Sequence, residues 1–352
     1  MKKISLPIFL LGIFFIAAIS MACDSTEMMS AKVYLQQNNL EKAEEQGLLA
    51  VNAEPLNPLP SFWLGSNVYV QQKRWEEMNA MFDKSLSISD KYEAEINFER
   101  DAQWVNIFNE GATTFNNVLN GTTSDAEADI DKAKMAFETA ILILPGKAQA
   151  YSSLASIYLH SKDNEMATEY LMKTLENDVD NINAHVNLGL ILSTDEKFDM
   201  ANEHLNKALV LDSGNLNALQ QLAQNYDIAG KSAEAEILYQ KAMDADPENS
   251  NLMYNLGVIY LKTNDYEKAE EMFIRSLALS PDDCDAIANV SVVYSNMDGR
   301  LEDAETYLMK SIDCAPTEHV YWRQLVGIYM KMGKPKEAQK ALDKAKELGY
   351  KP

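Results

Sequence analysis

Few side chains in this sequence have the types and spacings that catalysis or metal binding requires. No histidine pair has the HExxH spacing of a zinc protease, and no GxSxG, Walker or GxGxxG motif occurs. Paired acids such as Asp282 and Asp283 fall in turn-like segments, where helix capping is their expected role. We therefore expect no enzymatic activity, no metal and no cofactor. The four histidines are His160, His185, His204 and His319.

The charge balance excludes some classes of partner. The chain has 352 residues, with 53 acidic and 31 basic side chains and a net charge of −22. Such an acid excess argues against nucleic acid, because binding to phosphates requires a basic surface. Hydrophobic residues make up 47%, which suffices for a large core, whereas 14 glycines and 10 prolines are few. Long helices are therefore favoured over an all-β fold, in two or three domains or in one repeat array.

The N-terminal residues have the order of a secretory signal. Two lysines precede an apolar run at residues 8–19, which is shorter than the ~20 residues that a membrane-spanning helix needs. Small residues then lead to Cys23, so residues 1–22 predict a signal peptide. The position of Cys23 resembles the bacterial lipoprotein signal, in which this cysteine is lipidated. Ser20 departs from that family's preference for Leu, Val or Ile, and simple secretion is the alternative.

The remainder of the chain repeats with a period of 34 residues. Tyrosine recurs at this step at Tyr226, Tyr260 and Tyr294. The other positions that keep the step are Leu154, Leu188, Leu222 and Leu256, then Ala155, Gly189, Ala223 and Gly257, and then Ala167, Ala201, Ala235 and Ala269. Leucine, a small residue, tyrosine and alanine in this order resemble the tetratricopeptide repeat (TPR), whose unit is a pair of amphipathic helices. A single unit cannot bury its apolar face, so neighbouring units stack.

The resemblance implies an all-α solenoid of helical hairpins, wound in a right-handed superhelix of about nine helix pairs. The unit at 93–147 is longer than the others, because it has a long first helix and an inserted polar loop at 120–125. The predicted array covers residues 23–352, with repeats at about 25–57, 59–92, 93–147, 148–181, 182–215, 216–249, 250–283, 284–318 and 319–352.

Within this framework two residue pairs are expected to approach each other. Cys284 would begin the first helix of its repeat and Cys314 would end the second, so the two lie at neighbouring ends of one hairpin. A secreted compartment permits a disulfide between them, and two free, half-buried thiols are the alternative. His185 and His204 would face each other across another hairpin, where we expect a packing or surface role.

The resemblance also implies an inner groove, lined by the first helix of each repeat. Carboxamides stand at the sixth position of successive repeats, and each offers two donors and an acceptor. A row of them can bond both the N–H and the C=O groups of an extended peptide. The alternative is that they only pack or are solvated. The groove residues predicted to bind a peptide are Asn187, Gln221, Gln224, Asn255, Asn289, Arg323 and Gln324.

Together these patterns predict a non-catalytic protein-interaction scaffold, anchored to a bacterial membrane through Cys23. We expect it on the periplasmic or outer-surface side of the cell envelope, with an extended peptide or a partner helix in its groove. Two other functions fit the same residues. One is an accessory component of a nutrient-uptake or glycan-processing system at the cell surface. The other is a self-assembling structural protein.

Overall fold

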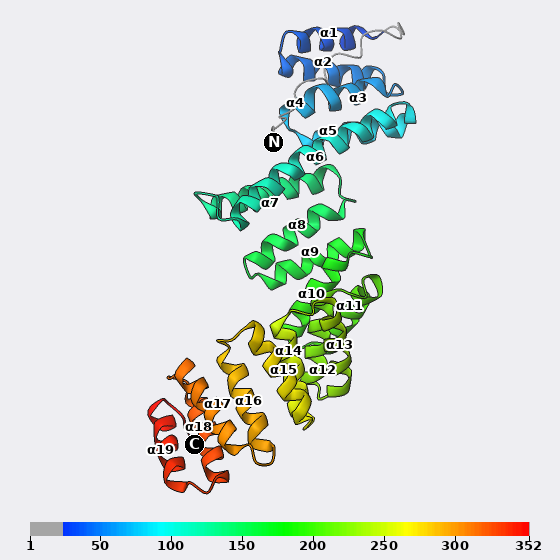
Figure 1. Ribbon diagram of the computed structural model, residues 1–352. Helices are drawn as coiled ribbons and strands as arrows, with labels where there is room; N and C mark the ends of the chain where they lie inside the picture. The colour runs from blue at the N-terminus through cyan, green and yellow to red at the C-terminus, as the bar shows by residue number, and fades with distance from the viewer. Residues whose placement is uncertain (1–23, 352) are drawn as a thin grey trace, which may run out of the picture. The chain divides into compact units, whose positions relative to one another are not determined.

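A computed structural model describes residues 24–351 as a succession of antiparallel helix pairs, with no strand in that range (Figure 1). The predicted signal peptide and Cys23 lie outside the described residues. The helices form nine pairs, as the 34-residue period predicts. The chain divides into two compact units at residues 157 and 158, within α8 (Ala148–His160).

Unit 1 contains three helix pairs and most of α8, and its second and third pairs are irregular. In the second pair a π-helical turn at Gly65–Tyr69 joins α3 and α4 into one interrupted helix. In the third pair the first helix has 27 residues, about twice the usual length, and a polar loop at 120–125 follows it. The helices are α1 (Thr26–Gln36), α2 (Leu40–Ala53), α3 (Leu59–Leu64), α4 (Val70–Gln72), α5 (Trp75–Ile88), α6 (Glu93–Leu119) and α7 (Ala126–Ile143).

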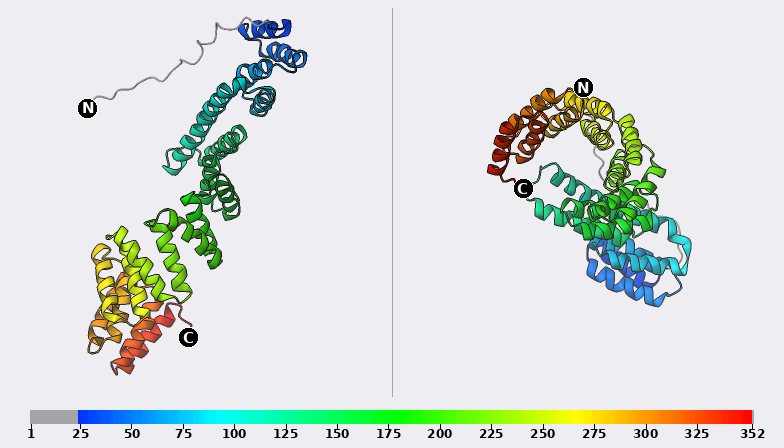
Figure 2. Two further views of the ribbon diagram at one scale, coloured as in Figure 1. Left: turned by 90° about the vertical axis from the view of Figure 1, so that its right-hand side faces the viewer. Right: turned by 90° about the horizontal axis from the view of Figure 1, so that it is seen from below.

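Unit 2 contains the regular pairs, whose helices have 13 or 14 residues each. Figure 2, right, shows the pairs from α14 to α19 following one another along a curve. The helices are α9 (Asn164–Asn177), α10 (Ile182–Thr194), α11 (Phe198–Leu211), α12 (Leu216–Ile228), α13 (Ser232–Ala245), α14 (Ser250–Lys262), α15 (Tyr266–Leu279), α16 (Cys284–Asn296), α17 (Leu301–Cys314), α18 (His319–Lys331) and α19 (Pro335–Glu347).

The same local chemistry begins most first helices of unit 2. Asn181, Asn215, Asn249 and Asp283 each precede a helix, and each side-chain oxygen accepts a hydrogen bond from a backbone N–H of the first turn. Such caps satisfy donors that have no partner within the helix, and each typically contributes about 1 kcal/mol. The 34-residue spacing of these four residues therefore fixes where each repeat starts.

Small residues at the eighth repeat position allow the two helices of a pair to approach closely. A Cβ atom on Gly189 would lie 2.6 Å from the side chain of Leu205 on the facing helix. Ala201 and Ala208 on that facing helix are fully buried. The core of the unit continues from pair to pair through such contacts, because each pair buries its second face against the next. Between residues 24 and 351, no helix is both long and apolar enough to cross a bilayer.

Candidate functional site

The first helices of the pairs in unit 2 form one continuous surface. Besides its own partner, α10 contacts α12, α14 contacts α16, and α16 contacts α18. Side chains on these helices can therefore meet across repeat boundaries. We call the surface formed by α10, α12, α14, α16 and α18 the inner face.

Ion pairs and hydrogen bonds join successive helices of the inner face. The Lys262 ammonium lies 2.8 Å from both carboxylate oxygens of Asp227, one repeat earlier. Lys331 donates to the backbone oxygen of Ser295 at 2.7 Å and to the amide oxygen of Asn296 at 3.2 Å. Both lysines are thus already engaged within the chain.

Two tyrosines make the same kind of link between repeats. The Asn289 amide donates to the Tyr254 hydroxyl at 3.1 Å, and the Tyr321 hydroxyl donates to Asp285 at 2.7 Å. Burial, followed by the hydrogen bond to Asp285, raises the pKa of Tyr321 well above its usual range. Tyr321 therefore stays protonated and keeps its role as the donor in this bond.

The predicted carboxamides belong to the helices of the inner face but are not equivalent. Asn187 and Asn255 are half-buried, and within residues 24–351 their side chains make no hydrogen bond at all. The amide of Gln221 donates to Asn225 at 3.1 Å, so that side chain is held in place. The amide oxygen of Gln324 is buried without a partner in the described part of the chain. Gln224 and Arg323 are exposed.

Asn225 is an anchor on this face that sequence reasoning missed. It is completely buried, and its amide donates to the Ser193 hydroxyl at 2.9 Å and to the Asn202 amide oxygen at 2.8 Å. A signal was present, because the equivalent position of neighbouring repeats is Ile191 or Ile259. A carboxamide where the other repeats have an aliphatic side chain indicates a buried polar network.

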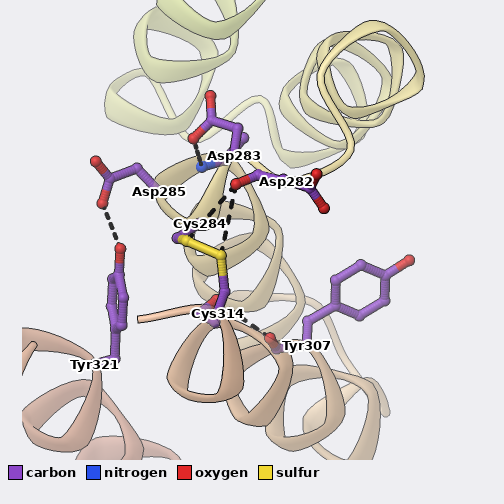
Figure 3. Close-up of a disulfide and its surroundings, with 9 residues drawn as sticks. Asp282, Asp283, Cys284, Asp285, Tyr307, Cys314 and Tyr321 are labelled. Carbon is purple, nitrogen blue, oxygen red and sulfur yellow. Dashed lines mark hydrogen bonds between the residues drawn. A yellow bond between two sulfur atoms is a disulfide. The ribbon is translucent and has the colours of Figure 1, made fainter. Parts of the chain in front are cut away.

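A disulfide joins the two ends of the α16–α17 hairpin (Figure 3). Cys284 and Cys314 have Cα atoms 5.8 Å apart, as expected from their places at the start of the first helix and the end of the second. The backbone oxygen of Asp282 lies 3.5 Å from the Cys314 sulfur. The bridge therefore fixes the geometry of the eighth repeat at the end where the preceding repeat joins it.

His185 and His204 meet across the α10–α11 hairpin, with their Nδ1 atoms 3.0 Å apart. The Nε2 of His185 lies 3.0 Å from the backbone oxygen of Val179, which can only accept, so this nitrogen carries the proton. The two rings are thus joined through their Nδ1 atoms, with one ring donating to the other. Burial, and then the neighbouring His185, lower the pKa of His204. Among the described residues, no group of three or more His, Cys, Asp or Glu side chains could hold a metal ion.

Comparisons with known proteins agree with this architecture. Residues 219–349 match a family model described as the Cilia and flagella-associated protein 70 middle TPR-like domain, and residues 148–180 match a tetratricopeptide repeat model. The solved structure of pilF from Pseudomonas aeruginosa aligns over 63% of this chain and 96% of its own, with a TM-score of 0.52 and 17% identity. At that identity the likeness shows the fold alone.

Two other solved structures align over about half of the chain. One is YrrB, described as a TPR protein with an unusual peptide-binding site, at 24% identity over 52% of this chain and 94% of that one, with a TM-score of 0.46. The other is MamA from Desulfovibrio magneticus, at 20% identity over 47% of this chain and 94% of that one, with a TM-score of 0.45. A search of the curated proteins found no significant match.

Proposed function

Because the chain is a tetratricopeptide repeat protein, we propose that it is a non-catalytic scaffold that binds an extended peptide or a partner helix on its inner face, while a lipid on Cys23 anchors it to a bacterial membrane. Repeats of this family typically form interaction scaffolds without catalytic activity. The inner face and the anchor are separate parts of the proposal, and each has its own test.

One observation on the inner face carries the binding proposal. Asn187 and Asn255 are half-buried side chains that find no hydrogen-bond partner within residues 24–351. Each offers two donors and one acceptor to a molecule lying along the face. A backbone in extended conformation presents alternating N–H and C=O groups, which is the complement of such side chains. Gln221, held between them by Asn225, adds a third group in a fixed orientation.

The cations of this face argue for recognition of a main chain rather than of a terminal carboxylate. Lys262 and Lys331 are paired with groups of the neighbouring repeat. Arg323 is exposed, and its guanidinium lies 6.0 Å from the ring centre of Tyr350. A ligand carboxylate would have to displace existing bonds to obtain two cations. A segment inside a longer chain requires no such displacement.

The inner face is tested by capture of partners from cells that produce the full-length protein. The variant Asn187→Ala/Asn255→Ala removes two side chains that make no hydrogen bond in the described part of the chain, so the melting temperature should not change. The control is Asn177→Ala/Asn206→Ala, which removes exposed carboxamides that donate to the backbone of their own second helices. We expect a copurifying protein with the wild type and the control, and its loss with the inner-face variant. Equal capture by all three would exclude the inner face.

The anchor is tested independently of partner capture. Cys23 precedes α1 closely, because that helix begins at Thr26. Stable attachment to a bilayer needs about two acyl chains, each contributing ~0.8 kcal/mol per buried methylene. We expect the wild type in the membrane fraction, labelled by a palmitate analogue, and Cys23→Ser unlabelled and released. An unlabelled wild type, or a variant that stays with the membrane, would contradict lipidation at Cys23.

A further inference from the structure

A cleft in unit 1 lies between α5, α6 and the end of α7. It has a volume of about 580 Å³. One wall is a face of α5, because its residues from that helix are three, four and seven positions apart. The lining residues are Glu76, Asn79, Ala80, Asp83, Arg100, Leu142, Ile143, Leu144 and Pro145.

Asn79 fixes the shape of this cleft. Its amide donates to the backbone oxygens of Leu142 at 2.8 Å and Ile143 at 3.3 Å, which are among the last carbonyls of α7. Its amide oxygen accepts from the Nε of Arg100 on α6 at 2.9 Å. One side chain on α5 therefore bonds to both neighbouring helices. The walls are held in place by the protein itself, so little ordering is required when a ligand enters.

The charge of the cleft is negative. The single cation, Arg100, has a side chain only 13% exposed and pairs with Asp83 at 2.6 Å. Glu76 is exposed and makes no ion pair with any described residue. The end of α7 adds the partial negative charge that every helix carries at its C-terminus. A positive group is therefore favoured in the cleft, and a negative one is opposed.

The cleft also offers apolar surface beside these acids. Leu142 is 40% exposed, Leu144 is half-buried and Pro145 is exposed. A side chain that combines a long aliphatic stem with a terminal cation would bury its methylene groups on these residues and keep its charge near Glu76. Lysine and arginine are the side chains with this combination.

We propose that this cleft is a second binding site, which takes a lysine or arginine side chain from an exposed segment of a partner protein. The occupant is a basic side chain flanked by apolar residues, because an acidic rim beside aliphatic surface is complementary to both. The site is distinct from the inner face and does not depend on it.

Three synthetic peptides test the proposal on the full-length protein. They are acetyl-Leu-Lys-Leu-amide, the same peptide with norleucine for lysine, and the same peptide with glutamate. Binding is followed by NMR through the side-chain amide of Asn79 and the Nε–H of Arg100. We expect shifts that grow with the lysine peptide, weaker shifts with norleucine and none with glutamate. Equal shifts for all three, stronger shifts with glutamate, or no shifts with any peptide would overturn the proposal.

A pair of variants distinguishes the effect of the Glu76 carboxylate from a general effect of the protein's net charge. Glu76→Gln removes the unpaired carboxylate of the cleft. We expect it to weaken the binding of the lysine peptide about two- to fivefold, as for the loss of an exposed ion pair. The control Glu45→Gln removes an exposed carboxylate of α2 that does not line the cleft. It should leave the affinity unchanged. An equal loss in both variants, or no loss with Glu76→Gln, would contradict the assigned role of Glu76.

Discussion

Gly257 on α14 lies directly against the ring of Phe273 on α15: a Cβ atom added to this glycine would be 2.9 Å from two ring carbons and 3.0 Å from a third. The ring is completely buried in the core of unit 2. The close contact between the two helices of this repeat therefore depends on the absence of one methyl group. Gly327 on α18 has no such contact, since a Cβ atom there would have no neighbour within 4 Å.

Gly257→Ala should therefore destabilise the protein, and Gly327→Ala should not. The first change overpacks a buried contact, at about 1–3 kcal/mol of unfolding free energy. The second gains helix propensity, about 0.8–1 kcal/mol, at an open position. Urea denaturation followed by circular dichroism measures both. If both substitutions changed the unfolding free energy in the same direction, the close approach of Gly257 to Phe273 would not determine the effect of Gly257→Ala.

This contact also indicates which parts of the fold a sequence can predict. Gly257, Ala201 and Tyr260 stand at repeat positions whose small or large size follows from packing within one hairpin of 34 residues. Their pattern recurs in phase, so it predicts nine helix pairs. The π-helical turn at Gly65–Tyr69 does not follow from any such pattern. It occurs in an irregular repeat. Because no other repeat has the same local insertion, the 34-residue pattern does not predict it.

The candidate sites are less predictable, because they depend on contacts between repeats. The sequence places Asn255 and Asn289 at the same repeat position. Only the structure shows that Asn289 is bonded to Tyr254, 35 residues away, whereas Asn255 has no such bond in the described chain. Asn79 bonds to the end of a helix 63 residues along the chain. No spacing rule within a repeat contains that information.

Removing the disulfide should cost stability locally. The bridge closes a loop with a sequence separation of 30 residues, for which the chain-entropy model gives about 3–4 kcal/mol. We expect Cys284→Ser/Cys314→Ser to lower the unfolding free energy of the repeats around α16 and α17. Because solenoid repeats contact only their neighbours, hydrogen exchange in α1 and α2 should not change.

Reductant provides the control for this prediction. Reduced wild type and the double variant should unfold alike, and reductant should have no effect on the variant. A reagent that reacts with free thiols should modify neither Cys284 nor Cys314 in the unfolded, non-reduced protein. Modification of both before reduction would show that the bridge does not form.

The His185–His204 pair should make stability depend on pH in mildly acidic solution. Burial lowers the pKa of His204 below its ordinary value of 6.5, so the unfolded chain binds this proton more readily than the folded one. Stability is then lost as pH falls from 6.5 through the folded-state pKa, and it is retained at higher pH. Lys207 and His185 oppose the charged form, whereas Glu203 favours it.

His204→Gln isolates this contribution, because glutamine can still donate to the Nδ1 of His185 but cannot titrate. Unfolding free energies measured at pH 8 and pH 5.5 should differ less in the variant than in the wild type. Carboxylates titrate in both proteins and cancel in the comparison. If the unfolding free energies at pH 8 and pH 5.5 differed as much or more in the variant, His204 would not be the cause of the pH dependence.

The turn between α10 and α11 carries a backbone conformation that favours glycine. Glu196 has φ of 59°, in the left-handed region, which costs a non-glycine residue about 1–2 kcal/mol. The equivalent turn between α12 and α13 has Gly230 there, with φ of 73°. Glu196→Gly should stabilise the protein by about 0.5–1 kcal/mol, since greater freedom in the unfolded chain offsets part of the gain. Glu234→Gly, at an exposed position in the first turn of α13, should destabilise by about as much.

The network around Asn225 links stability to the proposed binding face, and two substitutions separate these roles. Asn225→Ala leaves a cavity and removes both donated bonds, so it should cost about 2–3 kcal/mol. Asn225→Leu fills the space with an aliphatic side chain, as Ile191 and Ile259 do in neighbouring repeats. Ser193 still donates to the Gly189 oxygen at 2.8 Å, and half-buried Asn202 can turn to water. The leucine variant should therefore stay within about 1 kcal/mol of the wild type.

In the leucine variant, however, Gln221 loses the oxygen that holds its amide. If the inner face binds an extended segment through oriented carboxamides, Asn225→Leu should weaken partner capture while the melting temperature hardly changes. Gln221→Ala in the same background should then add little further loss, because the oriented amide is already gone. Full capture by the leucine variant would mean that the orientation of Gln221 contributes nothing to binding.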